Sequence, residues 1–324
     1  MRSLNKPALA IVVPCYNERE VLCETAKQLK EVLIALIGDG IISSNSKIVF
    51  VDDGSRDETW QLIENEKSRS EHISGVKLSR NFGHQGALLA GIHSAKLWYD
   101  CVITIDADLQ DDIHVIRDFV IQYQKGSEIV YGVRKSRTTD SFFKRATAQA
   151  YYKFMRKLGI DLIYNHADFR LMSKRAVSVL EDFEERNMFL RGIVPMLGFK
   201  SEVVYYDRKE RFAGETKYPL KKMLAFAFNG LTSFSIVPIR LVSIIGVLSF
   251  CLSFLTGVYA LIQKLLGHTE SGWTSIIISV WIIGGLMLMS VGLIGEYIGK
   301  IYWETKRRPA YIIEMDLTRD DGQK

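Results

Sequence analysis

Four carboxylates and a glutamine directly follow an apolar stretch in the first half of the chain. The segment reads CVITIDADLQDD from Cys101 to Asp112, and its apolar part has the composition of a buried strand. Such a strand would deliver Asp106, Asp108 and Gln110 at its carboxyl end. These oxygen ligands suit Mg²⁺ or Mn²⁺, which bind through one or two carboxylates plus substrate phosphates. A single D-x-D pattern is equally consistent with a solvated turn, so its surroundings must distinguish the two.

Three other short apolar runs end in polar clusters. Residues 9–13 precede PCYNE, 47–51 precede DDGS, and 76–78 precede SRNFGHQG. Helical patterns separate these runs, which predicts parallel βαβ units in an open α/β sheet with helices on both faces. Further strands are expected at 129–133 and 202–206. Because parallel strands end at the same edge, we predict one shared crevice lined by Pro14, Tyr16, Glu18, Asp52, Asp53, Asp106, Asp108 and Gln110.

Several classes of binding site are not indicated. The chain has neither G-x-G-x-x-G after its first strand nor G-x-x-x-x-G-K-[ST] anywhere. A net charge of +5 is small for a nucleic-acid binder, and no nucleic-acid-binding signature accompanies it, so we expect no nucleic-acid partner. The four cysteines lack C-x-x-C spacing, which favours a reducing compartment. Carboxylates and a metal without a glycine cradle suit a nucleotide whose diphosphate is held by the metal.

Five motifs in order resemble those of a known family. They are PCYNE at 14–18, VDDGS at 51–55, SRNFGHQGALLAG at 79–91, DADLQ at 106–110 and ADFRLMSKR at 167–175. In these the chain resembles the inverting family 2 glycosyltransferases of GT-A fold. The similar branch acts on polyprenyl phosphates and includes dolichol-phosphate mannose synthase and bacterial bactoprenol (undecaprenyl-phosphate) glucosyltransferases. One departure is Asp111-Asp112-Ile113, where members often have a His-Pro or Asp-Pro pair.

The resemblance implies roles for individual residues. Asp106, Asp108 and Gln110 would hold the metal and the diphosphate. Within this set our hypothesis is that Asp106 serves the nucleotide and sugar, while Asp108 and Gln110 hold the Mg²⁺ or Mn²⁺ ion. The nucleotide sugar would be bound by Pro14, Tyr16, Asn17, Glu18, Asp52, Asp53, Arg80, Asp106, Ala107 and Lys217.

Asp168 is implied at the position of the general base. A phosphomonoester has a second pKa of about 6 and is largely dianionic at neutral pH. We therefore interpret Asp168 as positioning the acceptor at least as much as removing a proton. Asp168 and Arg170 lie two apart on an extended segment and point to the same side, so a structural ion pair is the alternative.

Two basic segments follow the predicted sheet edge. The run from Arg134 to Arg137 ends the fifth strand, and RKERFAGETK at 208–217 forms a loop suited to close over two phosphates. A solvated face and a mobile loop without a role are the respective alternatives. We assign Arg134 and Arg208, with Asp168, to catalysis. We assign the acceptor phosphate to Arg134, Ser136, Arg137, Arg170 and Arg211.

Two apolar runs near the C-terminus, at about 239–262 and 273–298, are long enough to span a membrane. A buried hydrophobic helix is the alternative. Cations precede the first run and follow the second, which places both ends in the cytoplasm. We predict a GT-A catalytic domain at 1–215, an amphipathic membrane-interface helix at 216–237, a two-helix transmembrane hairpin at 238–299 and a cytoplasmic tail at 300–324. The spacing Gly295-x-x-x-Gly299 suits helix packing within the hairpin or in a homo-oligomer.

Together these features predict an integral membrane enzyme whose catalytic domain and both termini are cytoplasmic. It would move a hexose from a UDP- or GDP-sugar to a polyprenyl phosphate with inversion. Resemblance favours UDP-glucose and undecaprenyl phosphate over GDP-mannose. A processive polysaccharide synthase would carry Q-x-x-R-W and more spans, yet no Arg-Trp pair occurs. A silent nucleotide-sugar-binding scaffold would have lost carboxylates that this chain retains.

Overall fold

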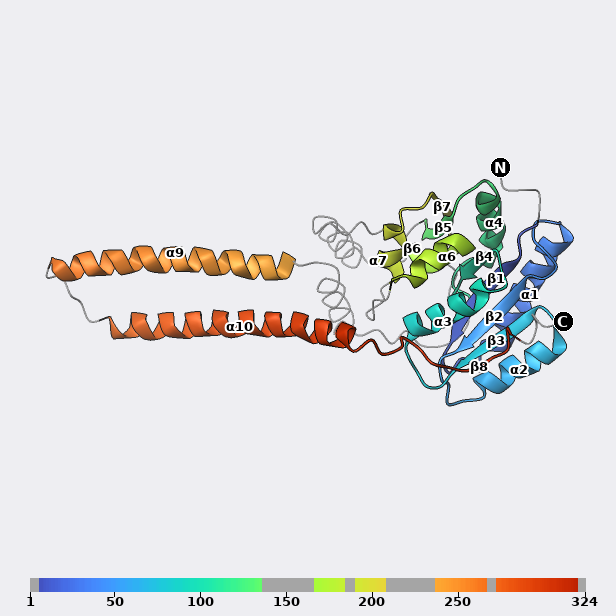
Figure 1. Ribbon diagram of the computed structural model, residues 1–324, viewed down its shortest axis with the longest axis horizontal. Helices are drawn as coiled ribbons and strands as arrows, with labels where there is room; N and C mark the ends of the chain where they lie inside the picture. The colour runs from blue at the N-terminus through green and yellow to red at the C-terminus, as the bar shows by residue number, and fades with distance from the viewer. Residues whose placement is uncertain (1–5, 136–165, 184–189, 208–236, 267–271, 320–324) are drawn as a thin grey trace. The chain divides into compact units, whose positions relative to one another are not determined.

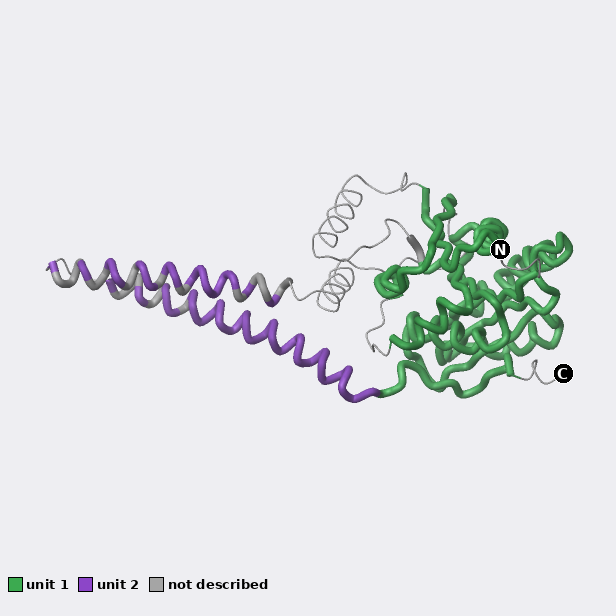
Figure 2. The backbone as a smooth tube through the Cα atoms, turned by 45° about the horizontal axis from the view of Figure 1, so that its top comes forward, with its two compact units in different colours: residues 1–156, 161–217, 308–324 green, residues 157–160, 218–307 purple. Residues whose placement is uncertain are grey.

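The structure, a computed structural model, describes residues 6–135, 166–183, 190–207, 237–266 and 272–319. The chain divides into two compact units, coloured separately in Figure 2. Unit 1 comprises residues 1–156, 161–217 and 308–324, and unit 2 comprises residues 157–160 and 218–307. Residues 308–324 therefore belong to unit 1, although they follow the long helices of unit 2 in the sequence.

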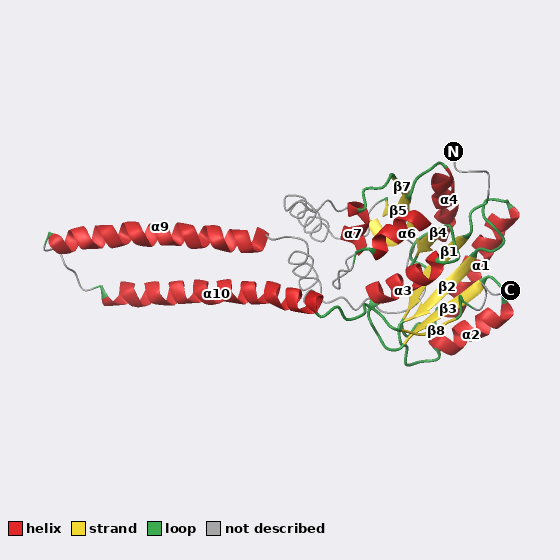
Figure 3. Cartoon of the chain, in the orientation of Figure 1, coloured by secondary structure: helices red, strands yellow, loops and turns green. Residues whose placement is uncertain are grey.

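Unit 1 is built on a mixed sheet of eight strands in the order β7-β5-β6-β4-β1-β2-β3-β8 (Figures 1 and 3). The strands are β1 (Leu9–Cys15), β2 (Lys47–Asp52), β3 (Ile73–Leu78), β4 (Cys101–Thr104), β5 (Ile129–Arg134), β6 (His166–Ser173), β7 (Ser201–Tyr206) and β8 (Ile313–Asp316).

The four central strands, β4-β1-β2-β3, are parallel, as the alternation of strand and helix predicted. The first strand extends beyond the predicted run at 9–13, since β1 continues through Pro14, paired with Val51, to Cys15. The pairing of β1 with β4 ends at Val12 and Thr104. Pro14 lacks an N–H, but the neighbour that this N–H would have faced has already ended, so no ladder bond is lost.

Two antiparallel strands were not anticipated. β6 lies between β4 and β5 and runs antiparallel to both, which brings Arg170 opposite Thr104 on one side and Tyr131 on the other. β8 runs antiparallel to β3 at the other edge of the sheet, with Met315 opposite Lys77. The Rossmann-like, mainly parallel sheet that we predict is therefore a mixed sheet, with parallel pairing at its centre and between β5 and β7.

Helices cover both faces of the sheet (Figure 1). One face packs against α1 (Leu22–Gly38), α2 (Thr59–Arg69) and α4 (Ile116–Gln124), which follows the short 3-10 helix η1 (Ile113–Val115). The opposite face packs against α3 (His84–Lys96) and α6 (Lys174–Glu181). A further short helix, α7 (Leu190–Met196), contacts β6.

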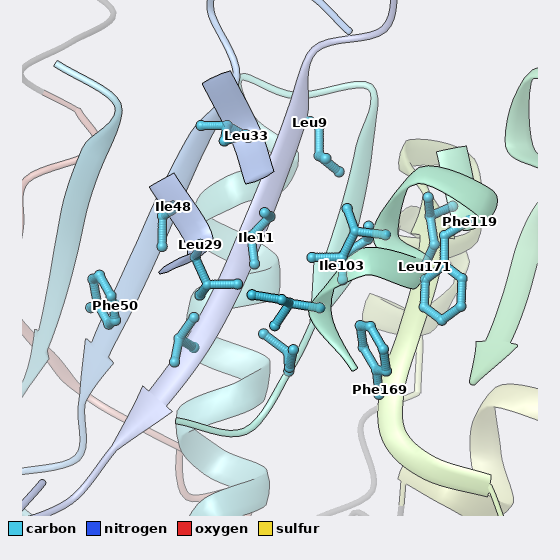
Figure 4. Packing of buried hydrophobic residues seen from close by; sticks show 14 of the residues in the cluster. Leu9, Ile11, Leu29, Leu33, Ile48, Phe50, Ile103, Phe119, Phe169 and Leu171 are labelled. Carbon is cyan, nitrogen blue, oxygen red and sulfur yellow. The ribbon is translucent and has the colours of Figure 1, made fainter. Parts of the chain in front are cut away.

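The main core lies between the sheet and α1, α2 and α4. Figure 4 shows Leu29 and Leu33 of α1 among strand residues such as Ile11 and Ile48. Successive side chains of a strand point to opposite faces of the sheet, so the apolar residues of β1 enter two different helix layers. On the other face a Cβ at Gly91 of α3 would lie 2.4 Å from a methyl carbon of Val12. The absence of a side chain there lets α3 approach the sheet closely.

Unit 2 contains α9 (Val237–Leu265) and α10 (Trp273–Thr305), which contact one another. Within the described ranges, one helical segment, Ile282–Thr305 of α10, has the length and apolar composition needed to cross a membrane. The two predicted spans at 239–262 and 273–298 and their topology thus stay a prediction. Large apolar side chains on both helices are exposed, for example Leu252 and Leu288.

Candidate active site

The predicted meeting of the first two polar clusters is confirmed at the carboxyl ends of β1 and β2. Asn17 donates its backbone N–H to Ser55 Oγ at 2.9 Å, and its side-chain oxygen accepts from Arg56 N at 2.8 Å. Glu18 donates its backbone N–H to Thr59 Oγ1 at 3.0 Å. Asn17 adopts the left-handed region with φ of 54°, which an asparagine tolerates better than most residues. These contacts fix PCYNE against DDGS.

Asp52 and Asp53 lie side by side at the end of β2 but have different partners. Asp53 accepts from Phe82 N at 2.7 Å and Gly83 N at 2.9 Å, so it holds the loop between β3 and α3. Asp52 is fully buried, and one of its oxygens, Oδ2, has no hydrogen-bond partner within the described ranges. Burial raises the pKa of both carboxyls. An unpartnered buried oxygen at this edge suits the N–H of a bound base.

The DADLQ segment leaves β4 as a tight loop fastened to α1. Thr25 Oγ1 donates to the carbonyl of Ala107 at 2.7 Å, and Gln110 N donates to Asp108 Oδ1 at 3.2 Å. Leu109 adopts a left-handed conformation with φ of 54°, which turns the chain between the two polar residues. The loop thus presents its carboxylates at the end of β4.

Asp106 has a pKa raised to about 6. Desolvation by the surrounding protein is the main cause, and the negative charges of Asp168, Asp111 and Asp108 add to it, while His84 opposes it. His84 Nε2 lies 3.6 Å from Asp106 Oδ1. Several carboxylates therefore converge at one point, and this crowding favours a bound cation or a bound proton.

Asp168 lies at the centre of a charged cluster on β6 and is only 4% exposed. Its carboxylate accepts from Arg170 Nη2, and from Arg191 Nε and Nη2 at 3.2 and 2.9 Å. His84 Nε2 lies 3.6 Å from Asp168 Oδ2. Burial alone would raise the pKa of Asp168, but the contact with His84 and the charges of Arg191 and Arg170 lower it well below its usual value. Asp168 is therefore ionised throughout the neutral range.

His84 begins α3 and bridges the two acidic segments, because the same Nε2 faces both Asp106 and Asp168. Burial alone would lower the pKa of His84. The contact with Asp168 and the charges of Asp106 and Asp168 raise it above its usual value. The residue links β4, β6 and α3 in one cluster.

Arg134, at the end of β5, is held by Asp111 rather than extended into solvent. Its Nη2 and Nε donate to Asp111 Oδ1 at 2.9 and 3.3 Å, and Tyr206 OH donates to the same oxygen at 2.6 Å. Burial would lower the pKa of Arg134, but the charge of Asp111 outweighs it and raises the pKa. Asp111 thus belongs to the structural support of this edge, directly after DADLQ.

The predicted role of Arg170 in binding the acceptor phosphate is difficult to reconcile with its burial. Its side chain is 1% exposed, pairs with Asp168, and donates to the carbonyl of Leu190 at 3.2 Å. A phosphate would reach this guanidinium only after a rearrangement. The alternative of a structural ion pair describes the observed contact.

The other predicted site residues divide into exposed, buried and undescribed ones. Tyr16 is 41% exposed, and Pro14 is buried in β1. Arg80 is exposed and its guanidinium lies 4.1 Å from the ring centre of Phe82. Five predicted residues lie outside the described ranges: Ser136, Arg137, Arg208, Arg211 and Lys217.

Within the described ranges, no three His, Cys, Asp or Glu side chains form a group that could hold a metal ion. The donor set instead fits the sparser arrangement that Mg²⁺ and Mn²⁺ accept, with two protein oxygens and the rest from substrate phosphate and water. The charge of Asp108 contributes to the raised pKa of Asp106. A divalent cation held by Asp108 and Gln110 would relieve that repulsion.

Sequence reasoning missed His84, Arg191 and the structural role of Asp111. His84 lies within the third polar cluster, SRNFGHQG, at the edge where parallel strands end, so the same edge rule could have included it. Arg191 had no such signal, because a single arginine at the start of a short helix has no distinctive spacing.

The site consists of carboxylates and cations at the carboxyl edge of a GT-A-like mixed sheet, an arrangement typical of transferases that use nucleotide-activated donors. The family model "Glycosyl transferase family 2" matches residues 10–180. The chain belongs to glycosyltransferase family 2, and it is accordingly a glycosyltransferase.

Several relatives match nearly the full length of the chain. "Uncharacterized glycosyltransferase YkoT" of Bacillus subtilis is 63% identical over 97% of this chain and 93% of its own. "Bactoprenol glucosyl transferase" of Shigella phage SfV is 38% identical over 95% of this chain and 98% of its own. A solved structure of glucosyl-3-phosphoglycerate synthase from Mycobacterium tuberculosis, in complex with Mn²⁺, UDP-glucose and phosphoglyceric acid, is 16% identical with a TM-score of 0.44, over 68% of this chain and 76% of that chain.

Proposed function

We propose that this glycosyltransferase moves glucose from UDP-glucose to undecaprenyl phosphate, with inversion, at the cytoplasmic face of a membrane. The observation that carries the proposal is the cluster of Asp106, His84 and Asp168, which joins the DADLQ loop to β6 at the carboxyl edge of the sheet. The relative named bactoprenol glucosyl transferase, matched over 95% of this chain, supports a glucosyl donor and a lipid carrier.

The donor would lie across the ends of β1, β2 and β4. The buried Asp52 oxygen without a partner would accept from the base, and Asp53 holds the loop that closes this side. Asp108 and Gln110 would hold Mg²⁺ or Mn²⁺, with Asp106 next to the sugar. When bound, the cation would supply charge neutralisation to the departing diphosphate.

In the transfer an oxygen of the acceptor phosphate forms a bond to the anomeric carbon. The bond from that carbon to the diphosphate oxygen breaks, and its electron pair leaves with UDP. A phosphomonoester is largely dianionic above its second pKa of about 6, so no proton has to be removed at neutral pH. Asp168, with its pKa held well below the usual value, is a poor proton acceptor and a suitable anchor for cations.

Membrane attachment would come from α9 and α10, with both spans and the cytoplasmic topology as predicted from the sequence. Their exposed apolar side chains, such as Leu252 and Leu288, are typical of helices that contact lipid rather than water. Anchoring the catalytic domain there would bring a water-soluble donor and a lipid acceptor to the same site.

The test supplies membranes containing the protein with radiolabelled UDP-glucose, UDP-galactose or GDP-mannose, with and without undecaprenyl phosphate and Mn²⁺. We expect one product, a glucosylated lipid phosphate of the predicted mass, that requires both the lipid and the metal. Membranes carrying Asp108→Asn serve as the matched control. If only GDP-mannose gave a lipid product, the donor would be GDP-mannose and not UDP-glucose. If no donor gave a lipid product, the assignment of undecaprenyl phosphate as the acceptor would be refuted.

A further inference from the structure

Arg191 is the more exposed of the two arginines that pair with Asp168. It is the second residue of α7, and both Nε and Nη2 donate to Asp168 Oδ2. The Arg191 side chain retains 37% of its accessible surface, whereas those of Asp168 and Arg170 retain 5% and 1%. Arg191 is therefore the guanidinium of this cluster that a substrate can reach.

Arg191 adds a second positive charge beside the single negative charge of Asp168. Arg170 is fully buried beside the same carboxylate and already balances its single negative charge. A second guanidinium brings additional positive charge to this side of the cluster. Asp106 joins the cluster through His84, whose Nε2 lies 3.6 Å from an oxygen of each acid. The exposed end of the cluster is thus suited to an anion.

The start of α7 is fixed before any ligand binds. Leu190 donates its backbone N–H to Gln85 Oε1 at 3.3 Å, and its carbonyl accepts from Arg170 Nη1 at 3.2 Å. The Arg191 guanidinium itself is fixed because its Nε and Nη2 both donate to Asp168. Pre-organisation of this kind lowers the entropy lost when arginine binds a ligand. A planar guanidinium also matches the geometry of a phosphate group.

We propose that Arg191 binds the terminal phosphate of the lipid acceptor and that Asp168 is the positioning residue that holds it there. The inference rests on the proposed function, in which the acceptor is a phosphomonoester. The same chemistry would recognise the diphosphate of the donor, so the test has one arm for each source.

The experiment measures equilibrium binding by the full-length protein in detergent. One arm uses farnesyl phosphate in the presence of UDP, and the other uses UDP-glucose. For Arg191→Gln we expect about tenfold weaker binding of farnesyl phosphate, since a charge-assisted hydrogen bond is lost. Binding of UDP-glucose should stay within about twofold of wild type, which also shows that the variant is folded.

Arg191→Lys is a second variant, which keeps the positive charge without the planar guanidinium. Its affinity for farnesyl phosphate should lie between those of wild type and Arg191→Gln. Arg117→Gln is the matched control, because Arg117 forms an ion pair with Asp39 on the surface of the same unit. In a transfer assay, Arg191→Gln should raise KM for undecaprenyl phosphate and leave KM for UDP-glucose unchanged.

Farnesyl phosphate binding within twofold of wild type in Arg191→Gln would overturn the inference, as would a loss confined to UDP-glucose. The binding arms do not depend on turnover. A wild-type protein that binds farnesyl phosphate through Arg191 but transfers no sugar to undecaprenyl phosphate would therefore refute the proposed function alone.

Discussion

Asp168 accepts hydrogen bonds from two guanidinium groups, so its negative charge is balanced before any substrate binds. Removing the charge leaves the buried Arg170 without a counter-ion. The broken pair should cost about 3–5 kcal/mol in the free energy of unfolding. Because the pKa of Asp168 is lowered in the folded protein, its contribution to stability is present above the unfolded pKa and is lost as pH falls through the lower folded pKa.

For Asp168→Asn we expect kcat/KM to fall about a hundredfold, by a similar factor at pH 6, 7 and 8.5, because misplacing a bound substrate by about 1 Å has an effect of this size. The residue is ionised across this range in the wild type, so a positioning role predicts no pH dependence of the loss. The measurement is transfer activity, with thermal unfolding in detergent as the folding control. Recovery of activity at pH 8.5 would instead identify Asp168 as the base.

Asp106 shows the opposite shift, and its effect on stability has the opposite sign. Its pKa of about 6 exceeds the unfolded value, so the folded state loses stability as pH rises from about 4 to 6. Asp106→Asn should therefore stabilise the metal-free protein at pH 7.5. We expect about 1 kcal/mol, since solvent screens a side chain that is 37% exposed. The gain should shrink at pH 4, and a destabilised variant at pH 7.5 would contradict the assignment.

The two acids of the D-x-D pattern should differ in their effect on metal binding. If Asp108 and Gln110 hold the cation and Asp106 lies next to the sugar, then Asp108→Asn should abolish the rise in Tm that Mn²⁺ and UDP produce together. Asp106→Asn should retain most of that rise. Differential scanning fluorimetry across a Mn²⁺ titration measures both. Equal Mn²⁺ affinities in the two variants would show that the acids share the ion.

Among the elements, the central strands β1 to β4 follow from the sequence, because each apolar run ends in a polar cluster and helical patterns separate the runs. The pairing of β6 between β4 and β5 does not follow, since an alternating strand gives no information on its partners. β8 is four residues long and was assigned to a tail. Arg170 illustrates the consequence. Its predicted contact with the acceptor phosphate requires an exposed side chain, but the neighbouring strands β4 and β5 bury it.

β8 attaches the C-terminal segment to the edge of the sheet beside α3. Ser79 donates its backbone N–H to the carbonyl of Ile312 at 3.0 Å, and Leu317 donates to that of Gly75 at 2.9 Å. Tyr311 OH lies 2.8 Å from His93 Nδ1 of α3. α3 carries His84 at its other end, so the last strand supports a helix of the site.

Truncation after Pro309 should lower the free energy of unfolding of unit 1 by about 2–4 kcal/mol, from several lost hydrogen bonds of about 1 kcal/mol each. It also exposes the edge of β3, which favours aggregation. Thermal unfolding and limited proteolysis of the full-length and shortened chains measure the effect. A chain that ends at Arg319 is the control and should behave as wild type; equal stability of all three would show that β8 contributes nothing.

At the scale of the whole molecule, the proposed topology places residue 272 outside and α1 inside the cell. In a Cys251→Ser background, Gly272→Cys should react with a membrane-impermeant maleimide on intact cells. The native Cys23, exposed on α1, should react only after permeabilisation. Labelling of both cysteines under the same condition would refute two spans with a cytoplasmic catalytic domain.

The position of β8 in the sequence has a consequence for biosynthesis. The ribosome completes this strand only after it has made α9 and α10, so unit 1 lacks one edge of its sheet while the apolar helices emerge. Insertion of those helices and completion of the catalytic fold are therefore ordered in time. A chain that stalls before residue 313 would present the unpaired edge of β3 to chaperones and proteases. Cellular quality control would recognise incompletely synthesised enzyme by this edge.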